Sequence, residues 1–221
     1  MKRALITGAN SGIGKALYKK LINNGYTVYR IGKKNSEIEV DLRDTKTLSK
    51  EIKKLLQKSE IDLLINCAGV GVFEPHEEIS IQKIEELIDV NLQAPILLCN
   101  LLLRSLKKTK GTIVNISSIE ATRNSKFSAL YSATKAGLRS FSLSLFEEVR
   151  KSGVKVININ PDITKTEFFD NLKFEPSDNP LTYIDPQNLA DEILHIINSP
   201  FVITDITVRA QKFAIKKKSG K

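Results

Sequence analysis

Short apolar runs of strand length alternate along this chain with longer segments of helical periodicity. The predicted strands are 3–7, 27–31, 38–40, 61–66, 112–117, 154–160 and 201–208. The predicted helices are 12–23, 45–58, 80–108, 130–152 and 186–198. Several strand runs are apolar at successive positions, as expected where both faces of a sheet are covered. The repeated order predicts one doubly wound α/β domain over 1–221, with helices on both faces of a parallel sheet.

The composition is typical of a soluble globular protein, because 41% of the 221 residues are hydrophobic and 27% are charged. No unbroken run of about 18 apolar residues is present to span a bilayer, and the apolar part of the first ten residues is too short for a signal peptide. Cys67 and Cys99 lie in apolar segments, without the spacing of a disulfide framework or a metal site. We therefore expect a cytoplasmic protein with reduced cysteines, no metal and no membrane partner.

The net charge of +9 suits either a nucleic acid or a small anionic ligand. Basic residues are spread along the chain, and their one cluster is the C-terminal KKKSGK at 216–221. We interpret that cluster as a frayed, solvated tail. Because no nucleic-acid-binding motif accompanies the charge, a small-molecule partner is expected and a nucleic acid is not.

The glycines that follow the first predicted strand indicate an anion site. In TGANSGIG, at 7–14, three glycines stand between a strand and a helix. Glycines let the backbone approach a pyrophosphate, and the free N–H groups at the helix start attract its charge. An ordinary turn is the alternative, but this position in an alternating chain favours a dinucleotide site. The residues of this stretch predicted to bind the cofactor are Thr7, Gly8, Asn10, Ser11, Gly12, Ile13 and Gly14.

The spacing Thr-Gly-x-x-x-Gly-x-Gly resembles that of the short-chain dehydrogenase/reductase family, in its non-extended branch. The resemblance covers about 1–210. It implies a Rossmann-type fold, a nicotinamide cofactor and an oxidoreductase acting on carbonyl or alcohol groups of a small molecule.

The end of the second predicted strand bears on cofactor choice. A carboxylate there would select NAD by holding the ribose 2′-hydroxyl. Instead Lys33 and Lys34 follow the strand, and Arg30 lies inside it. Because a cation attracts a 2′-phosphate, NADP(H) is favoured over NAD(H), with Lys33 as the first candidate contact. The lysines could instead be solvated loop charges, and Glu37 and Glu39 could still reach the ribose.

Three further segments resemble cofactor-binding motifs of the family. Asp41 stands where the family contacts the adenine amino group. The NCAG stretch resembles Asn-Asn-Ala-Gly, with Cys67 replacing the second Asn, and PDITKT resembles Pro-Gly-x-x-x-Thr, with Asp162 replacing the Gly. Asp adopts unusual backbone conformations more readily than most residues, so the loop can tolerate it. The residues that these motifs assign to the cofactor are Asp41, Leu42, Asn66, Ala68, Gly69, Pro161, Ile163 and Thr166.

The family's catalytic residues Asn, Ser, Tyr and Lys match this chain in order and spacing. Asn91 lies in DVNLQAP, and YSATK supplies Tyr131 and Lys135. The family's interval between Ser and Tyr selects Ser118 rather than Ser117. In the family Asn carries a water-mediated proton relay, and Tyr and Lys also contact the cofactor.

The chemistry explains why these residue types are needed. Hydride transfer to a carbonyl leaves an alkoxide that must be protonated, and a phenol with a pKa near 10 is a poor donor unless tuned. Lys135 lies one helical turn after Tyr131, so its charge is expected to lower the tyrosine pKa by roughly 3 units at most. Ser118 is expected to hydrogen-bond the substrate oxygen and stabilise its developing charge.

A predicted substrate loop at 165–185 carries Phe168, Phe169, Leu172, Phe174, Leu181 and Tyr183. These side chains could form an apolar lid over a carbonyl compound, or equally close the domain's own core. The Leu-rich segments 91–108 and 130–150 correspond to interface helices in the family, so a homodimer or homotetramer is expected.

Together these observations predict an NADP(H)-dependent carbonyl reductase that also runs as an alcohol dehydrogenase. The alternative is a catalytically weak NADP(H)-binding module that regulates or binds a partner. The presence of all four catalytic residues argues against the alternative.

Overall fold

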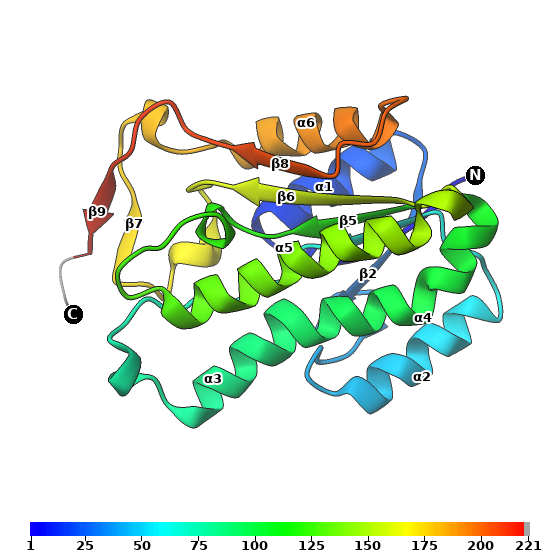
Figure 1. Ribbon diagram of the computed structural model, residues 1–221, viewed down its shortest axis with the longest axis horizontal. Helices are drawn as coiled ribbons and strands as arrows, with labels where there is room; N and C mark the ends of the chain where they lie inside the picture. The colour runs from blue at the N-terminus through cyan, green and yellow to red at the C-terminus, as the bar shows by residue number, and fades with distance from the viewer. Residues whose placement is uncertain (219–221) are drawn as a thin grey trace.

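Seven parallel strands form one sheet in the order β3-β2-β1-β4-β5-β6-β8 in the computed structural model, which describes residues 1–218 (Figure 1). The strands are β1 (Arg3–Thr7), β2 (Thr27–Gly32), β3 (Ile38–Glu39), β4 (Leu63–Asn66), β5 (Thr112–Ile116), β6 (Lys155–Pro161) and β8 (Asp205–Val208). Their order reverses between β1 and β4. Ligands of doubly wound sheets bind at such a reversal, beyond the carboxyl ends of the strands. The predicted fold class is confirmed.

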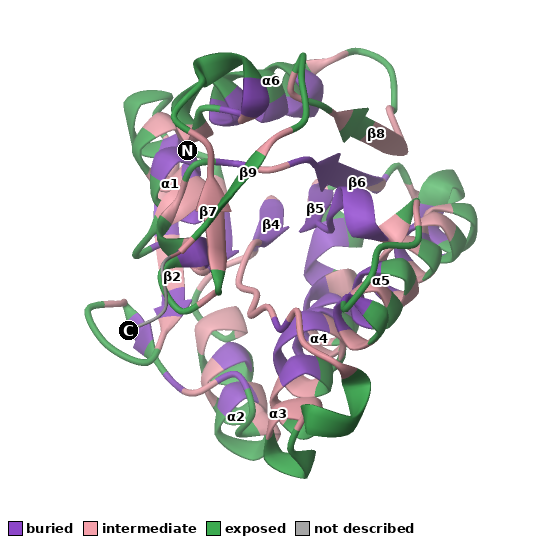
Figure 2. Cartoon of the chain, turned by 90° about the vertical axis from the view of Figure 1, so that its left-hand side faces the viewer, coloured by how far each residue is buried: buried purple, intermediate pink, exposed green. Residues whose placement is uncertain are grey.

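Helices cover both faces of this sheet (Figures 1 and 2). On one face α1 (Gly12–Asn23) contacts α6 (Pro186–Asn198). On the other face α4 (Ala94–Thr109) lies between α2 (Thr45–Leu56) and α5 (Ala129–Val149). Each face has its own apolar core of Leu, Ile, Val and Ala side chains. Short 3-10 turns are His76–Glu78, Ile119–Ala121, Arg150–Ser152, Glu167–Phe169 and Pro180–Thr182.

The central strands β4 and β5 are buried along their whole length, which explains why LLIN and TIVNI show no alternation. Their parallel register places Asn66 opposite Asn115. The Asn66 amide donates to Oδ1 of Asn115 at 2.8 Å, and Asn115 Nδ2 donates to Oγ of Ser142, on α5, at 2.8 Å. This buried polar chain fixes α5 against the sheet.

The predicted helix 80–108 is divided in the structure. It begins as α3 (Ile81–Ile88), passes through a π-helical turn at Asp89–Gln93, and continues as α4. Pro95 has no N–H to donate to the carbonyl of Asn91 four residues earlier, so the regular hydrogen-bond ladder is interrupted here. π-Helical turns occur often at functional sites, and this one contains Asn91.

The interpretation of 216–221 as a frayed tail is wrong for its first residues. Strand β9 (Ile215–Lys217) pairs antiparallel with β7 (Phe174–Pro176), inside the predicted substrate loop. Nζ of Lys218 also donates to the carbonyls of Phe169 and Asp170, at 2.5 and 2.9 Å. Residues 219–221 of the predicted tail lie outside the described residues. The C-terminal strand is therefore tied to the substrate loop, in front of the carboxyl ends of the main sheet (Figure 2).

The helical segment Ile81–Thr109 is the one helix in the described part of the chain that is long and apolar enough to cross a membrane. It has 29 residues, a hydropathy of 1.4 over its most apolar stretch, and 44% of that stretch buried in the protein. A count of unbroken apolar runs does not find it, because charged residues interrupt the segment. The core helix of a soluble protein meets the same criteria, and α4 contacts α2, α5 and the sheet.

Candidate active site

A cleft of about 770 Å³ lies at the carboxyl ends of the main strands, where the fold places a ligand. It brings together most of the residues predicted for the site. Those that line it are Gly8, Asn10, Ser11, Gly12, Ile13, Gly14, Lys33, Asp41, Leu42, Ala68, Gly69, Ser118, Tyr131, Lys135, Pro161, Ile163 and Thr166.

Three predicted site residues lie behind the cleft wall. Thr7 accepts hydrogen bonds at Oγ1 from the backbone N–H groups of Cys67 and Ala68, both at 3.0 Å, and so joins the end of β1 to the NCAG turn. Asn66 is bound to Asn115 in the sheet. Asn91 is fully buried and binds the backbone of Val70. These residues shape the site from behind.

The glycine loop leaves no space for side chains. A Cβ on Gly14 would lie 2.1 Å from the carbonyl oxygen of Gly8. Gly8 has a φ of +70°, and a Cβ there would lie 2.8 Å from the backbone of Ala68. The loop therefore presents bare backbone to the cleft, as close approach to a diphosphate requires.

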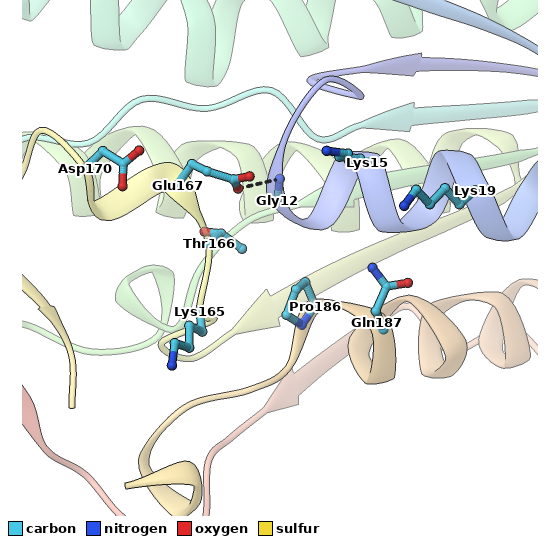
Figure 3. Close-up of a pocket in the computed structure, with 9 residues that line it drawn as sticks. All are labelled: Gly12, Lys15, Lys19, Lys165, Thr166, Glu167, Asp170, Pro186 and Gln187. Carbon is cyan, nitrogen blue, oxygen red and sulfur yellow. Dashed lines mark hydrogen bonds between the residues drawn. The ribbon is translucent and has the colours of Figure 1, made fainter. Parts of the chain in front are cut away.

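The N-terminus of α1 already binds an anion from this chain. Asp44 and Asp185 cap α2 and α6 with their own side chains, but Ser11 makes no such bond to α1. Instead the backbone N–H of Gly12 donates to Oε2 of Glu167 at 2.9 Å, across 155 positions of sequence (Figure 3). The carboxylate stands in for an anionic oxygen, so the residues present here fit a cofactor diphosphate.

Two cations surround Asp41 at the other end of the cleft. Its Oδ2 lies 3.2 Å from Nζ of Lys33 and 2.6 Å from Nη2 of Arg43. The Arg43 guanidinium above all holds the pKa of this carboxyl well below its usual range, and Lys33 adds to the effect. Sequence reasoning did not single out Arg43, although it stands only two residues after Asp41.

The acidic residues that could have opposed NADP(H) are engaged elsewhere. Glu37 forms an ion pair with Arg30, whose Nη2 lies 2.7 Å from its Oε1. Glu39 accepts a hydrogen bond from the backbone N–H of Asn35 at 2.8 Å. The side chain of Arg30 also lies over the ring of Tyr18. Among Arg30, Lys33 and Lys34, the basic residues in or just after β2, only Lys33 lines the cleft.

The four predicted catalytic residues converge from three elements. Tyr131 and Lys135 lie on α5, Ser118 follows β5, and Asn91 lies in the π-helical turn. Nζ of Lys135 and Oδ1 of Asn91 lie 3.4 and 3.5 Å from where a Cβ on Gly69 would stand. The absent side chain at Gly69 thus leaves room for both polar groups beside the cleft.

The choice of Ser118 over Ser117 agrees with the geometry. Ser117 is buried and donates its hydroxyl to the carbonyl of Lys135 at 2.8 Å, a bond that holds α5 to the end of β5. Ser118 lines the cleft, and its hydroxyl accepts a hydrogen bond from the backbone N–H of Glu120 at 3.2 Å. Burial raises the pKa of the Tyr131 phenol, and the Ser118 hydroxyl, which faces Tyr131, opposes part of that rise.

The expectation that Lys135 lowers the pKa of Tyr131 is wrong for this arrangement. Burial raises the pKa of Tyr131 to about 12 and lowers that of Lys135 to about 8. Nζ of Lys135 donates to the carbonyl of Ile116 at 2.9 Å and lies 5.9 Å from the centre of the Tyr131 ring. One helical turn brings the two residues together, but it does not direct the ammonium to the phenol oxygen.

Asn91 joins the loop after β4 to α5. Its Oδ1 accepts from the N–H of Val70 and its Nδ2 donates to the carbonyl of Val70, both at 2.9 Å. Nδ2 also lies 3.2 Å from Oγ1 of Thr134, one residue before Lys135. Its side chain thus holds the wall behind the Tyr131–Lys135 pair.

Glu120 is a buried carboxylate at the site that no sequence motif indicated. Its Oε1 lies 2.7 Å from Nη2 of Arg123 and accepts from Ser125, and its Oε2 accepts from Ser128. The charge of Glu120 contributes to the raised pKa of Tyr131. These bonds fix the segment between Ser118 and α5.

Asp162 replaces the family's glycine without backbone strain, because its φ is not positive. Its Oδ1 accepts from the N–H of Ile163 at 2.9 Å, and its Oδ2 lies 3.5 Å from Nε of Arg209. The pairing with Arg209 compensates the charge of Asp162, which is buried at the cleft.

Aromatic rings cover the end of the cleft that contains Tyr131. Phe73 and Phe168 lie against Tyr131, with ring centroids 5.1 and 6.0 Å away, and Phe169 and Phe174 extend the cluster. Of the predicted loop residues, Phe168, Phe169, Leu172 and Phe174 line the cleft, whereas Leu181 and Tyr183 do not. The first half of the loop thus borders the cleft and the second half does not, and the lid stays a prediction.

This arrangement places a phenol, a hydroxyl and an amine beside a backbone cradle for a dinucleotide. It suits proton transfer next to a bound nicotinamide. Within residues 1–218, no group of three or more His, Cys, Asp or Glu side chains is placed to hold a metal ion.

Residues 2–176 match the family described as short chain dehydrogenase. An uncharacterized oxidoreductase of Staphylococcus saprophyticus is 30% identical, over 94% of this chain and 97% of its own length. Among solved structures, 4-hydroxyisoleucine dehydrogenase complexed with NADH and succinate has a TM-score of 0.81 at 26% identity, covering 94% of this chain and 97% of that one. An alcohol dehydrogenase from the archaeon Thermococcus sibiricus, complexed with 5-hydroxy-NADP, has a TM-score of 0.85 at 23% identity, covering 97% and 99% of the two chains.

Because it is only 23% identical, the similarity to the archaeal alcohol dehydrogenase concerns the fold alone. The family match and the staphylococcal relative extend over most of the chain. Together with the glycine loop and the cleft that it borders, they confirm the predicted resemblance: this protein is an oxidoreductase that belongs to the short-chain dehydrogenase family.

Proposed function

We propose that this oxidoreductase transfers a hydride between NADP(H) and a carbonyl or alcohol substrate, with Tyr131 as general acid and base. The proposal is carried by one observation: Ser118, Tyr131 and Lys135 line the same cleft as the bare backbone of the glycine loop. A bound nicotinamide supplies or accepts the hydride there. The chain's own residues supply the proton and hold the substrate oxygen.

Each polar residue then has a separate task. In reduction, the Tyr131 phenol gives its proton to the substrate oxygen, while the Ser118 hydroxyl stabilises the charge that develops on that oxygen. Lys135 holds the ribose of the cofactor and carries a proton below pH values near 8. Asn91 fixes the wall behind them through Val70 and Thr134.

The preference for NADP(H) is supported by the charges around Asp41. Lys33 and Arg43 form ion pairs with Asp41. Glu37 pairs with Arg30, and Glu39 accepts a hydrogen bond from Asn35, so neither carboxylate is free to oppose a 2′-phosphate. The structural relatives carry both types of cofactor, because one is complexed with NADH and another with 5-hydroxy-NADP. The argument for NADP(H) over NAD(H) therefore rests on residues of this chain and not on the similar structures.

The test is a titration of the purified protein with NADPH and with NADH, following nicotinamide fluorescence. NADPH is expected to bind about tenfold more tightly, since a contact between the 2′-phosphate and the Lys33 ammonium is expected to gain about 1.4 kcal/mol. Tighter binding of NADH would contradict the interpretation of Lys33, after β2, as a contact for the 2′-phosphate. No binding of either would contradict both the proposed function and the NADP(H)-binding regulatory alternative.

Tyr131→Phe separates catalysis from binding. Loss of the phenol hydroxyl is expected to lower kcat by at least about a hundredfold on any carbonyl compound that the enzyme reduces, because no other acid occupies that position. The Kd for NADPH should change by less than about twofold. A variant that keeps most of its kcat would show that Tyr131 is not the proton donor.

We also propose that the protein works in the cytoplasm as a homodimer or homotetramer. Its apolar helices α4 and α5 and its two free, buried or half-buried cysteines support this.

A further inference from the structure

The turn Glu167–Phe169 touches both halves of the cleft. We propose that Glu167 and Phe168 form a plug that the cofactor diphosphate displaces, and that this displacement uncovers Tyr131. Glu167 thereby sets the affinity for the cofactor, and Phe168 links cofactor binding to substrate access. This inference rests on the proposed NADP(H)-dependent function.

Glu167 occupies the place that a diphosphate oxygen needs. Its Oε2 accepts the backbone N–H of Gly12 at 2.9 Å, and α1 has no side-chain cap from Ser11 to take that position (Figure 3). A single N–H at a helix start cannot bind two anions at full strength. A diphosphate placed there would also repel the carboxylate.

The displaced carboxylate has a place to go. Beside Gly12 and Glu167 lies a hollow of about 420 Å³ that is lined by Lys15, Lys19 and Lys165 (Figure 3). Glu167 is exposed to solvent, so its side chain can rotate without breaking a core contact. The basic hollow stabilises the carboxylate once it has left the N-terminus of α1.

Phe168, the next residue, covers the catalytic tyrosine. Its ring centroid lies 6.0 Å from that of Tyr131, and its Cζ lies 2.5 Å from where a Cβ on Gly71 would stand. Tyr131 is only 6% exposed, although it borders a cleft of about 770 Å³. The bond from Gly12 to Glu167 anchors this turn of three residues, so its loss releases the backbone that positions Phe168.

The first experiment measures the Kd for NADPH in Glu167→Gln. The amide keeps a group able to accept the Gly12 N–H, but it removes the competing charge. We expect NADPH to bind about three- to tenfold more tightly at low ionic strength, with a smaller gain in high salt. Asp170→Asn is the matched control: Asp170 lines the same hollow, and no described residue donates to its carboxylate. Its Kd should change by less than about twofold.

A fragment without a diphosphate tests whether the effect is local. Adenosine 2′-phosphate reaches the Lys33 end of the cleft but not Gly12. Its Kd should be equal in the wild-type protein and in Glu167→Gln. If the substitution lowered the Kd of both ligands by the same factor, Glu167 would act through long-range electrostatics and not at Gly12. That result would reject the plug.

Phe168→Trp tests the link to Tyr131, since the chain has no other Trp. Addition of NADP⁺ should move the emission maximum to longer wavelength as the side chain leaves the aromatic cluster. Adenosine 2′-phosphate should leave it unchanged. An unshifted maximum at saturating NADP⁺ would refute the link.

These outcomes are separable from failure of the proposed function. If the wild-type protein binds neither NADPH nor NADH, the proposed function fails and the plug fails with it. If it binds NADPH and Glu167→Gln binds it equally, the plug alone is wrong.

Discussion

Tyr131 and Lys135 show how burial and function oppose each other at single residues. Lys135 is 4% exposed, and burial lowers its pKa to about 8 from its ordinary value of 10.5. At neutral pH the protein therefore holds a charged amine in an environment that favours the neutral form. Lys135, to which we assign a role in the active site, therefore carries a cost in stability.

Lys135→Met should stabilise the cofactor-free protein at pH 7. The folded protein releases the Lys135 proton more readily than the unfolded chain does, so unfolding takes up a proton between pH 8 and 10.5. The stability of the wild-type protein relative to the variant should rise with pH from about 8. Below that pH the variant should be more stable by about 1 to 3 kcal/mol.

Urea denaturation at pH 7, 8, 9 and 10 measures this difference. Above pH 10 the stability of both proteins should fall, because burial raises the pKa of Tyr131 to about 12 and the unfolded chain loses that proton first. A variant less stable than the wild type at pH 7 would mean that the bond from Lys135 to Ile116 outweighs the burial of its charge.

Lys33→Glu should change cofactor preference. A carboxylate at the exit of β2 repels a 2′-phosphate, so the affinity for NADPH should fall roughly tenfold or more, while the affinity for NADH stays equal or rises. Lys34→Glu is the control, because Lys34 carries the same charge next in sequence but does not line the cleft. Equal losses in both variants would point to net charge and not to a contact at Lys33.

At the scale of elements, the loop between β1 and α1 and the π-helical turn before α4 build the two walls of the site. The loop is tight because Gly14 and Gly8 touch through backbone atoms. The π-helical turn carries Asn91 to the backbone of Val70. The glycine loop thus contributes bare backbone to the cleft, whereas the π-helical turn contributes the buried side chain of Asn91.

Gly14→Ala should damage this loop. The new Cβ would lie 2.1 Å from the carbonyl oxygen of Gly8, so the loop must open. We expect a loss of about 1 to 3 kcal/mol in stability and no measurable NADPH binding. Gly137→Ala, where the Cβ would meet only the flexible side chain of Leu92 at 3.3 Å, should keep binding within about twofold. Thermal unfolding and nicotinamide fluorescence report the two effects.

At the scale of the whole molecule, helix α4 carries apolar side chains on its outer face as well as on the face that packs against the sheet. Leu98, Cys99 and Leu102 are buried in the core, whereas Ile96 is 36% exposed. Helices α4 and α5 contact each other, so their outer faces form one surface (Figure 1). A second copy of this chain would cover it.

Light scattering after size exclusion should therefore give a mass of at least about twice that of one chain. Ile96→Glu should shift the protein toward the monomer, because a buried carboxylate without a partner opposes the contact. Ile22→Glu, at an equally apolar exposed position of α1 on the other face of the sheet, should leave the mass unchanged. A wild-type monomer would exclude this oligomer.

The sequence by itself determined the fold class, because the alternation of buried strands and amphipathic helices admits few topologies. Motif spacing, which is local in sequence, selected Gly8, Ser118 and Tyr131, and the structure brings these three residues to one cleft. The tertiary structure decided what depends on contacts between distant segments. Glu167 reaches Gly12 across 155 positions, and β9 pairs with β7. Burial reversed the expected effect on the Tyr131 pKa, because desolvation depends on everything packed around a group and not on its neighbour one helical turn away.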